Sequence, residues 1–307
     1  MKTKKDTSLC KRYLIFILLI PILNACIEDV NLKDLNIEPK MVLFCYISPM
    51  FDTNKVYLTN SQPLLSSNAD ELGVITNAKV QISTDSVNWV SFTYHLPSER
   101  YILPSNDFPI EEGKTYYIRA TAPGFDEMIR SSCKVPVYRD INIKIDTQLT
   151  VQDYYKSIIF NFSWKDFAGE QNYYYVPVYD TYEEYYFEKD TMRSVLYSNP
   201  VYNEATNDYV FSDEKNDGKI LKGNYSLWID EYQPKNYDTL RFNFVQMDKI
   251  AYMYWSSLIR YYGSISFMGI VEPVILYNNI ENGYGLFSAF VFKTYRFVLK
   301  DESIEEY

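Results

Sequence analysis

The chain has 307 residues, of which 47% are hydrophobic and 23% charged, and its formal net charge is −10. This composition is typical of a folded globular protein and excludes an intrinsically disordered chain. An acidic surface repels phosphate backbones, so nucleic acid is not an expected partner.

The first 25 residues have the layout of a secretory signal peptide. Basic residues precede an apolar run from Tyr13 to Leu23, which is too short to span a bilayer as a stable helix. Ala25 directly before Cys26 resembles a bacterial lipobox, in which the cysteine is diacylated and becomes the mature N-terminus. We therefore expect lipidation of Cys26, and the acyl chains to anchor the protein to a membrane. The alternative is an ordinary cleaved signal followed by an incidental cysteine.

Residues 26–39 form an acidic tether in this interpretation. Glu28 and Asp29, directly after the cysteine, resemble the export signal that carries Bacteroidota lipoproteins to the outer face of the outer membrane. The alternative is a solvated acidic linker without a sorting role.

Residues 40–137 read as short strands separated by turn signals. Val80 and Ile82 alternate with polar neighbours, which is the period-two pattern of a half-buried strand. The expected strands are 41–47, 55–60, 78–83, 88–95, 100–103, 114–122 and 127–135. Seven short strands in about a hundred residues predict an immunoglobulin-like or prealbumin-like sandwich.

A domain boundary is expected near Pro136, followed by a second, tyrosine-rich β domain over residues 138–307. Its expected strands are 138–145, 158–164, 173–179, 224–229, 239–246 and 286–298. Residues 248–262 instead place Ala251, Trp255 and Leu258 on one face at helical spacing. Asp248 is the expected N-cap and Gly263 the expected C-terminal stop of this amphipathic helix.

The sequence offers few groups for catalysis or metal binding. His95 is the single histidine and no Gly-x-Ser-x-Gly elbow occurs, so neither a paired-histidine zinc site nor a serine triad is expected. The segment 213–218 superficially resembles a calcium loop, but Lys215 and Asn224 occupy positions that require ligands, so an exposed turn is the interpretation. We expect no catalytic residue, no metal and no cofactor. Cys45 and Cys133 are interpreted as buried thiols, with a disulfide as the alternative.

The tyrosine excess marks a candidate binding surface. Tyrosines are enriched at interfaces, although they also populate ordinary strands. The candidate binding residues are the aromatic side chains Tyr182, Tyr185, Tyr186 and Phe187, together with Asn282 in the loop near Gly283 and Gly285. Ser86, Thr191 and Thr239 lie in triplets that resemble the Bacteroidota O-glycosylation sequon.

Several segments together resemble one known family. They are the lipobox, the strand 78–82, the Phe211–Glu214 segment and the Asn279-Ile280…Gly283…Gly285…Phe287 motif. They are similar to the Bacteroidota outer-membrane lipoproteins classified as domain of unknown function 4249. Gly283 and Gly285 are expected to adopt positive φ, either to close the core or, alternatively, to shape a ligand loop.

The resemblance implies a surface-exposed outer-membrane lipoprotein that often accompanies a TonB-dependent receptor. It supplies no catalytic residue. The expected function is therefore a non-enzymatic accessory that captures cargo for the transporter or scaffolds the complex. A surface adhesin or matrix component is the alternative, and a hydrolase with an unmarked carboxylate pair is a third. The sequence does not identify the cargo.

Overall fold

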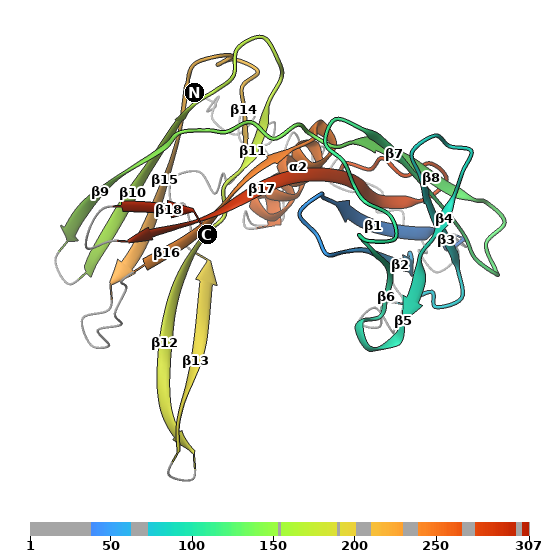
Figure 1. Cartoon of the computed structure of the whole chain (residues 1–307), viewed down its shortest axis with the longest axis horizontal. Coiled ribbons are helices and arrows are strands. Elements are labelled where there is room, and N and C mark those ends of the chain that lie inside the picture. Colours follow the sequence, from blue (N-terminus) through green and yellow to red (C-terminus); the bar gives the residue numbers. More distant parts are fainter. Residues whose placement is uncertain are drawn as a thin grey trace, which may run out of the picture. The chain divides into compact units, whose positions relative to one another are not determined.

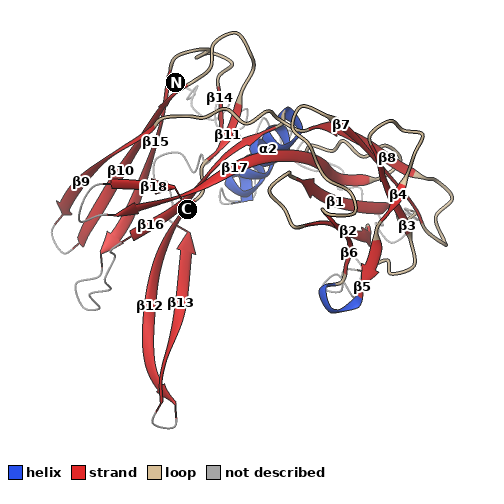
Figure 2. Cartoon of the chain, viewed as in Figure 1, coloured by secondary structure: helices blue, strands red, loops and turns tan. Residues whose placement is uncertain are grey.

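The computed structural model describes residues 38–62, 73–152, 155–188, 191–200, 210–229, 239–265, 274–298 and 303–306. The predicted signal peptide, Cys26, Glu28 and Asp29 lie outside these ranges. The described chain is mainly β with one long helix, as expected (Figure 2). No helix within the described ranges is both long and apolar enough to cross a membrane.

The strands before residue 137 follow the expected series closely. They are β1 (Met41–Ile47), β2 (Thr53–Asn60), β3 (Lys79–Ser83), β4 (Val90–Ser91), β5 (Thr93–His95), β6 (Arg100–Pro104), β7 (Thr115–Thr121) and β8 (Ile129–Lys134). A short 3-10 turn covers Leu96–Ser98.

The later elements include strands that the pattern did not predict, namely β13, β14, β18 and the part of β12 after Tyr179. The strands are β9 (Ile143–Gln152), β10 (Tyr155–Lys165), β11 (Tyr173–Tyr175), β12 (Val178–Glu188), β13 (Thr191–Pro200), β14 (Val210–Ser212), β15 (Ile220–Ile229), β16 (Thr239–Met247), β17 (Tyr284–Val298) and β18 (Ser303–Glu306). The helix α2 covers Lys249–Ile265.

Three expected strands are interrupted or shortened, each for an identifiable physical reason. The segment 88–95 is divided between two sheets, because buried Phe92 donates its N–H to Val80 and separates β4 from β5. The segment 173–179 is interrupted at Pro177, which has no N–H to donate to a ladder. The segment 138–142 precedes β9 as a linker, and the Gln246 side chain bonds to both the N–H and the carbonyl of Arg139 (3.0 and 2.5 Å).

One long sheet organises the described strands. Its main path runs β13-β12-β16-β17-β1-β2-β6-β5, with β11, β14 and β18 attached beside it. A sheet in the order β4-β3-β7-β8 and another in the order β15-β10-β9 complete the described set. The expected sandwich arrangement is confirmed.

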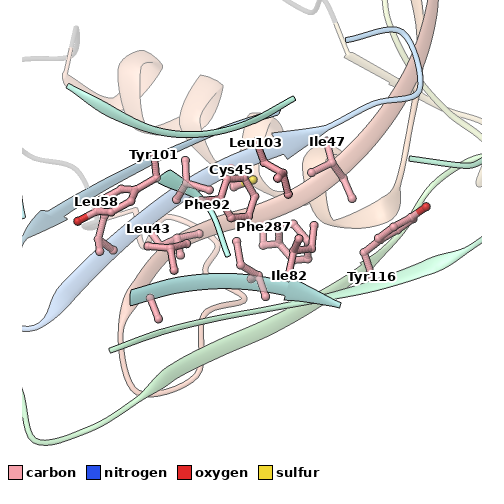
Figure 3. Packing of buried hydrophobic residues seen from close by; sticks show 14 of the residues in the cluster. Leu43, Cys45, Ile47, Leu58, Ile82, Phe92, Tyr101, Leu103, Tyr116 and Phe287 are labelled. Carbon is pink, nitrogen blue, oxygen red and sulfur yellow. The ribbon is translucent and has the colours of Figure 1, made fainter. Parts of the chain in front are cut away.

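The first core lies between the β2-β1-β17 part of the long sheet and the β3-β7-β8 sheet. Leu43, Cys45 and Ile47 of β1 point toward Ile82 and Tyr116 of the facing strands (Figure 3). Cys45 and Cys133 are both buried and free, which confirms the interpretation as thiols that pack as small apolar groups. Burial raises the pKa of both thiols.

The second core lies between the β15-β10-β9 sheet and the β12-β16-β17 part of the long sheet. It is strongly aromatic. Phe162 meets Phe242 edge to face at 5.0 Å, and Trp164 meets Phe244 at 5.2 Å with the rings nearly perpendicular. Edge-to-face pairs of this kind contribute about 0.5–1.5 kcal/mol beyond the area they bury.

The strand β17 belongs to both cores. Its first part, Tyr284–Ala289, pairs in parallel with β1, and its second part, Phe290–Val298, pairs antiparallel with β16 (Figure 1). Phe287 is buried in the first core and Phe297 in the second. The domain boundary near Pro136 stays a prediction, but the backbone ladder of β17 links the strands on either side of it.

The start of β17 approaches the backbone of β1 very closely. Gly285 has φ +117°, and a Cβ there would collide with the carbonyl oxygen of Leu43. Gly283 was also expected to have positive φ, and this is wrong. A side chain is excluded there by space instead, since a Cβ would lie 2.6 Å from the Met41 oxygen and 2.8 Å from Ile129 Cγ2. The glycines therefore close the core.

The side chain of Asn279 also stabilises the first part of β17 through two hydrogen bonds to the backbone of Phe287. Its Nδ2 donates to the Phe287 carbonyl (2.8 Å), and its Oδ1 accepts the Phe287 N–H (3.0 Å). This side chain supplies both backbone bonds that a neighbouring strand would otherwise make.

The Gly285–Leu43 contact is testable with a matched pair of glycine substitutions. We expect Gly285→Ala to lower the free energy of unfolding by about 3 kcal/mol or more, because positive φ and a backbone collision act together. Gly124→Ala is the control, since Gly124 also has positive φ (+86°) but nothing within 4 Å of its Cβ position. Urea unfolding should give a loss of about 1–2 kcal/mol for the control. Equal losses for both variants would contradict the close approach.

Candidate functional site

An open groove lined mainly by aromatic side chains lies between α2 and the outer face of the long sheet. It has a volume of about 590 Å³. The aromatic groove comprises Phe44, Tyr46, Phe51, Thr53, Lys55, Tyr57, Arg100, Tyr254, Trp255, Leu258 and Phe290.

Strand alternation explains why these residues share one face. On β1, Leu43, Cys45 and Ile47 point into the first core, so Phe44 and Tyr46 point to the opposite face. The residues of β2 alternate in the same way, with Val56 and Leu58 buried and the intervening side chains on the groove side. Each strand therefore packs one face in the first core and lines the groove with the other face.

Ring contacts hold the groove walls in position. Phe44 meets Tyr254 of α2 edge to face at 5.9 Å, and Phe51 meets Phe290 of β17 at 5.4 Å with perpendicular rings. Trp255 stacks on Tyr175 of β11 at 5.4 Å. Since each wall contacts a different strand or helix, the groove is a product of tertiary packing.

The charged groups of the groove are cations. The Arg100 guanidinium lies 3.7 Å from the centroid of the Tyr57 ring, and Lys55 belongs to the same lining. Among the residues that line this groove in the structure, none is acidic. Although the whole chain has a net charge of −10, the charge of this lining is positive, and a positive lining attracts anionic groups.

Asp248 fixes the helix that forms one wall. It is the N-cap of α2, as expected, and its Oδ1 accepts the Ala251 N–H at 2.8 Å. The same carboxylate accepts a hydrogen bond from Ser288 Oγ (2.6 Å) and from the Ala289 N–H (3.1 Å), which ties α2 to β17. Gly263 was expected to stop this helix, and this is wrong, because the helix continues to Ile265.

Burial also acts on the titration of groups beside the groove. It raises the pKa of Asp248 to about 6, although the bonds from Ser288 and the backbone oppose the shift. It also raises the pKa of Tyr46, whose hydroxyl is hydrogen-bonded by Trp255.

The predicted binding residues occupy two different places in the chain. Tyr182, Tyr185, Tyr186 and Phe187 lie on β12, which pairs with β13 along its length, with Tyr182 opposite Tyr197 and Phe187 opposite Met192. Asn282 is exposed in the turn before β17, and its Nδ2 donates to the Met128 carbonyl at 3.2 Å. A role in binding stays a prediction for all five.

The predicted glycosylation sites also stay predictions. Ser86 is exposed in a tight turn after β3, where Asp85 accepts the N–H groups of Val87 and Asn88. Those bonds lower the pKa of the Asp85 carboxyl. Thr191 begins β13 and Thr239 begins β16.

A second cavity of about 560 Å³ lies beside Trp89 and β8. Arg119 stacks over Trp89 at 4.0 Å and donates two bonds to Gln81 Oε1, while Arg130 forms a two-point ion pair with Glu281. The charge of Arg130 is neutralised by Glu281, whereas no acidic side chain is among the described residues that line the aromatic groove, so the groove is the better candidate for binding an anionic ligand.

The sequence pattern placed Trp255 and Leu258 on the apolar face of the helix, but it marked none of the groove residues as a binding site. Phe44, Tyr57 and Arg100 were inside expected strands, and Tyr254 and Trp255 were inside the expected helix. The one signal available was the large aromatic content on the supposed solvent face of the first two strands. It becomes meaningful only when α2 is placed over that face.

Fold and groove together define a class: a mainly β protein in which two sandwiches share one sheet, with an aromatic groove beside its helix. Within that class, the chain belongs to the family described as domain of unknown function DUF4249, whose model matches residues 27–296. None of the curated proteins compared with the chain matches it.

The titration of Asp248 gives a prediction about pH. A carboxyl has an ordinary pKa of about 3.9, so between pH 4 and 6 the folded state retains a proton that the unfolded state has lost. The free energy of unfolding should therefore fall by up to about 3 kcal/mol as pH rises through this window.

Asp248→Asn should remove this contribution while keeping a side chain that caps helices. Urea unfolding of both proteins at a series of pH values measures the effect. The free energy of unfolding of the wild type, relative to that of Asp248→Asn, should fall between pH 4 and 6. The free energy of unfolding of Asp248→Ala should be lower than that of Asp248→Asn by about 1 kcal/mol at every pH, because alanine cannot cap the helix. Parallel curves for the wild type and Asp248→Asn would contradict a raised pKa.

Proposed function

We propose that the protein is a lipid-anchored, surface-exposed accessory of a TonB-dependent nutrient transporter, and that it captures cargo in the aromatic groove. The observation that carries the proposal is the groove itself: aromatic walls, two cations and an open volume of about 590 Å³ on an acidic protein. The lipobox at Cys26 and the acidic residues that follow it support the anchored location. No part of this proposal requires a reaction.

The groove chemistry defines the class of cargo. Its stacked and edge-on rings favour a flat apolar or aromatic surface, because such surfaces bury area at little entropic cost. Lys55 and Arg100 favour an anionic group on the same molecule. The cargo is therefore a small anionic molecule with a planar apolar face.

The tyrosines of β12 have a separate role in this proposal. Tyr185 and Tyr186 lie on a strand that pairs with β13 at residues Ser194 and Arg193. Tyrosine supplies large contact area at protein interfaces. We assign this hairpin, β12 and β13, to contact with the receptor, and the groove to contact with cargo.

Anilinonaphthalene sulfonate, an anionic aromatic fluorophore, tests the groove directly. We expect the folded protein to bind it with increased fluorescence, and Trp255→Ala and Arg100→Gln each to weaken binding by about tenfold, or about 1.4 kcal/mol. Tyr262→Ala is the matched control, because Tyr262 is an exposed aromatic on the same helix that does not line the groove. Melting temperatures measured in parallel identify any variant that has lost its fold. Equal binding by the groove variants and the control would exclude the groove as the site.

Purification from membranes of cells that carry the natural gene tests the location and the partner. Mass spectrometry should find an acylated N-terminal Cys26 and a co-purified TonB-dependent receptor. Tyr185→Ala and Tyr186→Ala should reduce receptor recovery without lowering the melting temperature. Soluble, unacylated protein would contradict the anchor, and recovery of pilin-like proteins instead of a receptor would support the adhesin alternative.

A further inference from the structure

Three aspartates from two segments far apart in sequence meet beyond the end of β10. Asp166 follows β10, while Asp213 and Asp217 belong to the turn between β14 and β15. One carboxylate oxygen from each lies within 4.8 Å of one from each of the others. Asp166 and Asp213 are buried, and Asp217 is exposed.

The two segments hold each other in place through these carboxylates. Asp166 Oδ2 accepts the Gly218 N–H at 2.9 Å, and Asp217 Oδ1 accepts the Gly169 N–H at 2.8 Å. Asp213 Oδ2 accepts the Asn172 N–H at 2.9 Å. Each carboxylate thus accepts a hydrogen bond from a backbone N–H of the opposite segment.

One carboxylate oxygen of Asp213 has no hydrogen-bond partner among the residues that the structure describes. Asp213 is 1% exposed, and its Oδ1 is buried without a hydrogen bond. Burial of a carboxylate oxygen without a donor is unfavourable, and two further carboxylates beside it add repulsion. A bound cation would remove both penalties. Burial and the nearby Asp166 and Asp217 also raise the pKa of the Asp213 carboxyl.

We propose that Asp166, Asp213 and Asp217 form a binding site for a hard divalent cation of the calcium class. Calcium takes six to eight oxygen ligands at about 2.3–2.6 Å, so two ligands on opposite sides of the ion are about 4.8 Å apart. The separation of the three carboxylate oxygens fits that limit. Exposed Asp217 leaves one side open, where water completes the coordination. Magnesium requires near-ideal octahedral geometry, which a site left open at exposed Asp217 does not enforce.

This site differs from the calcium loop that the sequence analysis rejected. That loop would need a carboxylate or amide ligand where Lys215 stands and a bidentate glutamate where Asn224 stands, and neither residue belongs to the cluster. The missing carboxylate comes from Asp166 instead, which folding brings against the turn. The cation would join the ends of β10 and β14 to the starts of β11 and β15, next to the aromatic second core. Tyr174 of that core donates its hydroxyl proton to Asp166 Oδ1 (2.6 Å).

Thermal melting of the purified mature chain, first treated with a chelator, provides the test. Calcium chloride should raise the melting temperature, and magnesium chloride at the same concentration should raise it less. Calorimetric titration should give one calcium ion per chain. Asp213→Asn should abolish the calcium-dependent rise.

Glu214→Gln is the control, because it removes an exposed charge from the neighbouring position of the same turn without touching the cluster. It should keep the full response to calcium. Should Asp213→Asn fail to fold, Asp217→Asn replaces it, and this exposed substitution should weaken calcium affinity by about tenfold.

Two results would overturn the proposal. Wild-type protein that neither binds calcium in the titration nor melts at a higher temperature with it would exclude the site. In that case a more stable Asp213→Asn would show that Asp213 is instead held as a neutral, protonated acid. Equal loss of the calcium response in Asp213→Asn and Glu214→Gln would show that calcium raises the melting temperature only by screening acidic charge in general, without binding at this site.

Discussion

The parallel pairing of β17 with β1 is the constraint on which the rest of the structure depends. It requires the backbone at Gly285 to pass against the carbonyl of Leu43, an approach that any side chain would prevent. Once this pairing forms, Phe287 enters the first core and Phe297 enters the second along the same strand. The two sandwiches are then joined by backbone hydrogen bonds and by shared apolar burial.

The aromatic groove follows from the same arrangement. Because β17 continues past β1 to β16, its outward side chain Phe290 lies beside Tyr46 (5.7 Å). Asp248 bonds to the Ala289 N–H and so sets the start of α2 against that part of the strand. The helix then carries Tyr254 and Trp255 to the groove. The site is thus a consequence of how β17 and α2 are connected, and no single segment of the chain contains it.

Local features of the sequence could predict much of the fold. The alternation of apolar residues in Met41–Ile47 defines β1 to the residue, and the helical spacing after Asp248 defines α2 and its cap. The break at Pro177 has a local cause, and attention to the proline could have found it. The division at Phe92 depends on a hydrogen bond to Val80 of another strand, so the local pattern does not show it. The parallel partner of β1 could not be predicted, because Val42 and Tyr284 are far apart in the chain and parallel registers leave no turn signal. The groove and the aspartate cluster share this limitation. The sequence does not show that Asp166 lies beside Asp213 and Asp217, because only folding brings the end of β10 against the 213–218 turn.

Because β17 belongs to both cores, we expect the two sandwiches to unfold as one cooperative unit, and unfolding observed from both cores tests this most directly. Trp89 reports on the β3-β7-β8 side and Trp164 on the second core, so two variants that each retain one of these tryptophans, with the other tryptophans replaced by Phe, separate the signals. Urea unfolding should give the same midpoint and the same slope for both reporters, as a two-state transition requires. Two separate transitions, with one core unfolding while the other stays folded, would contradict the account.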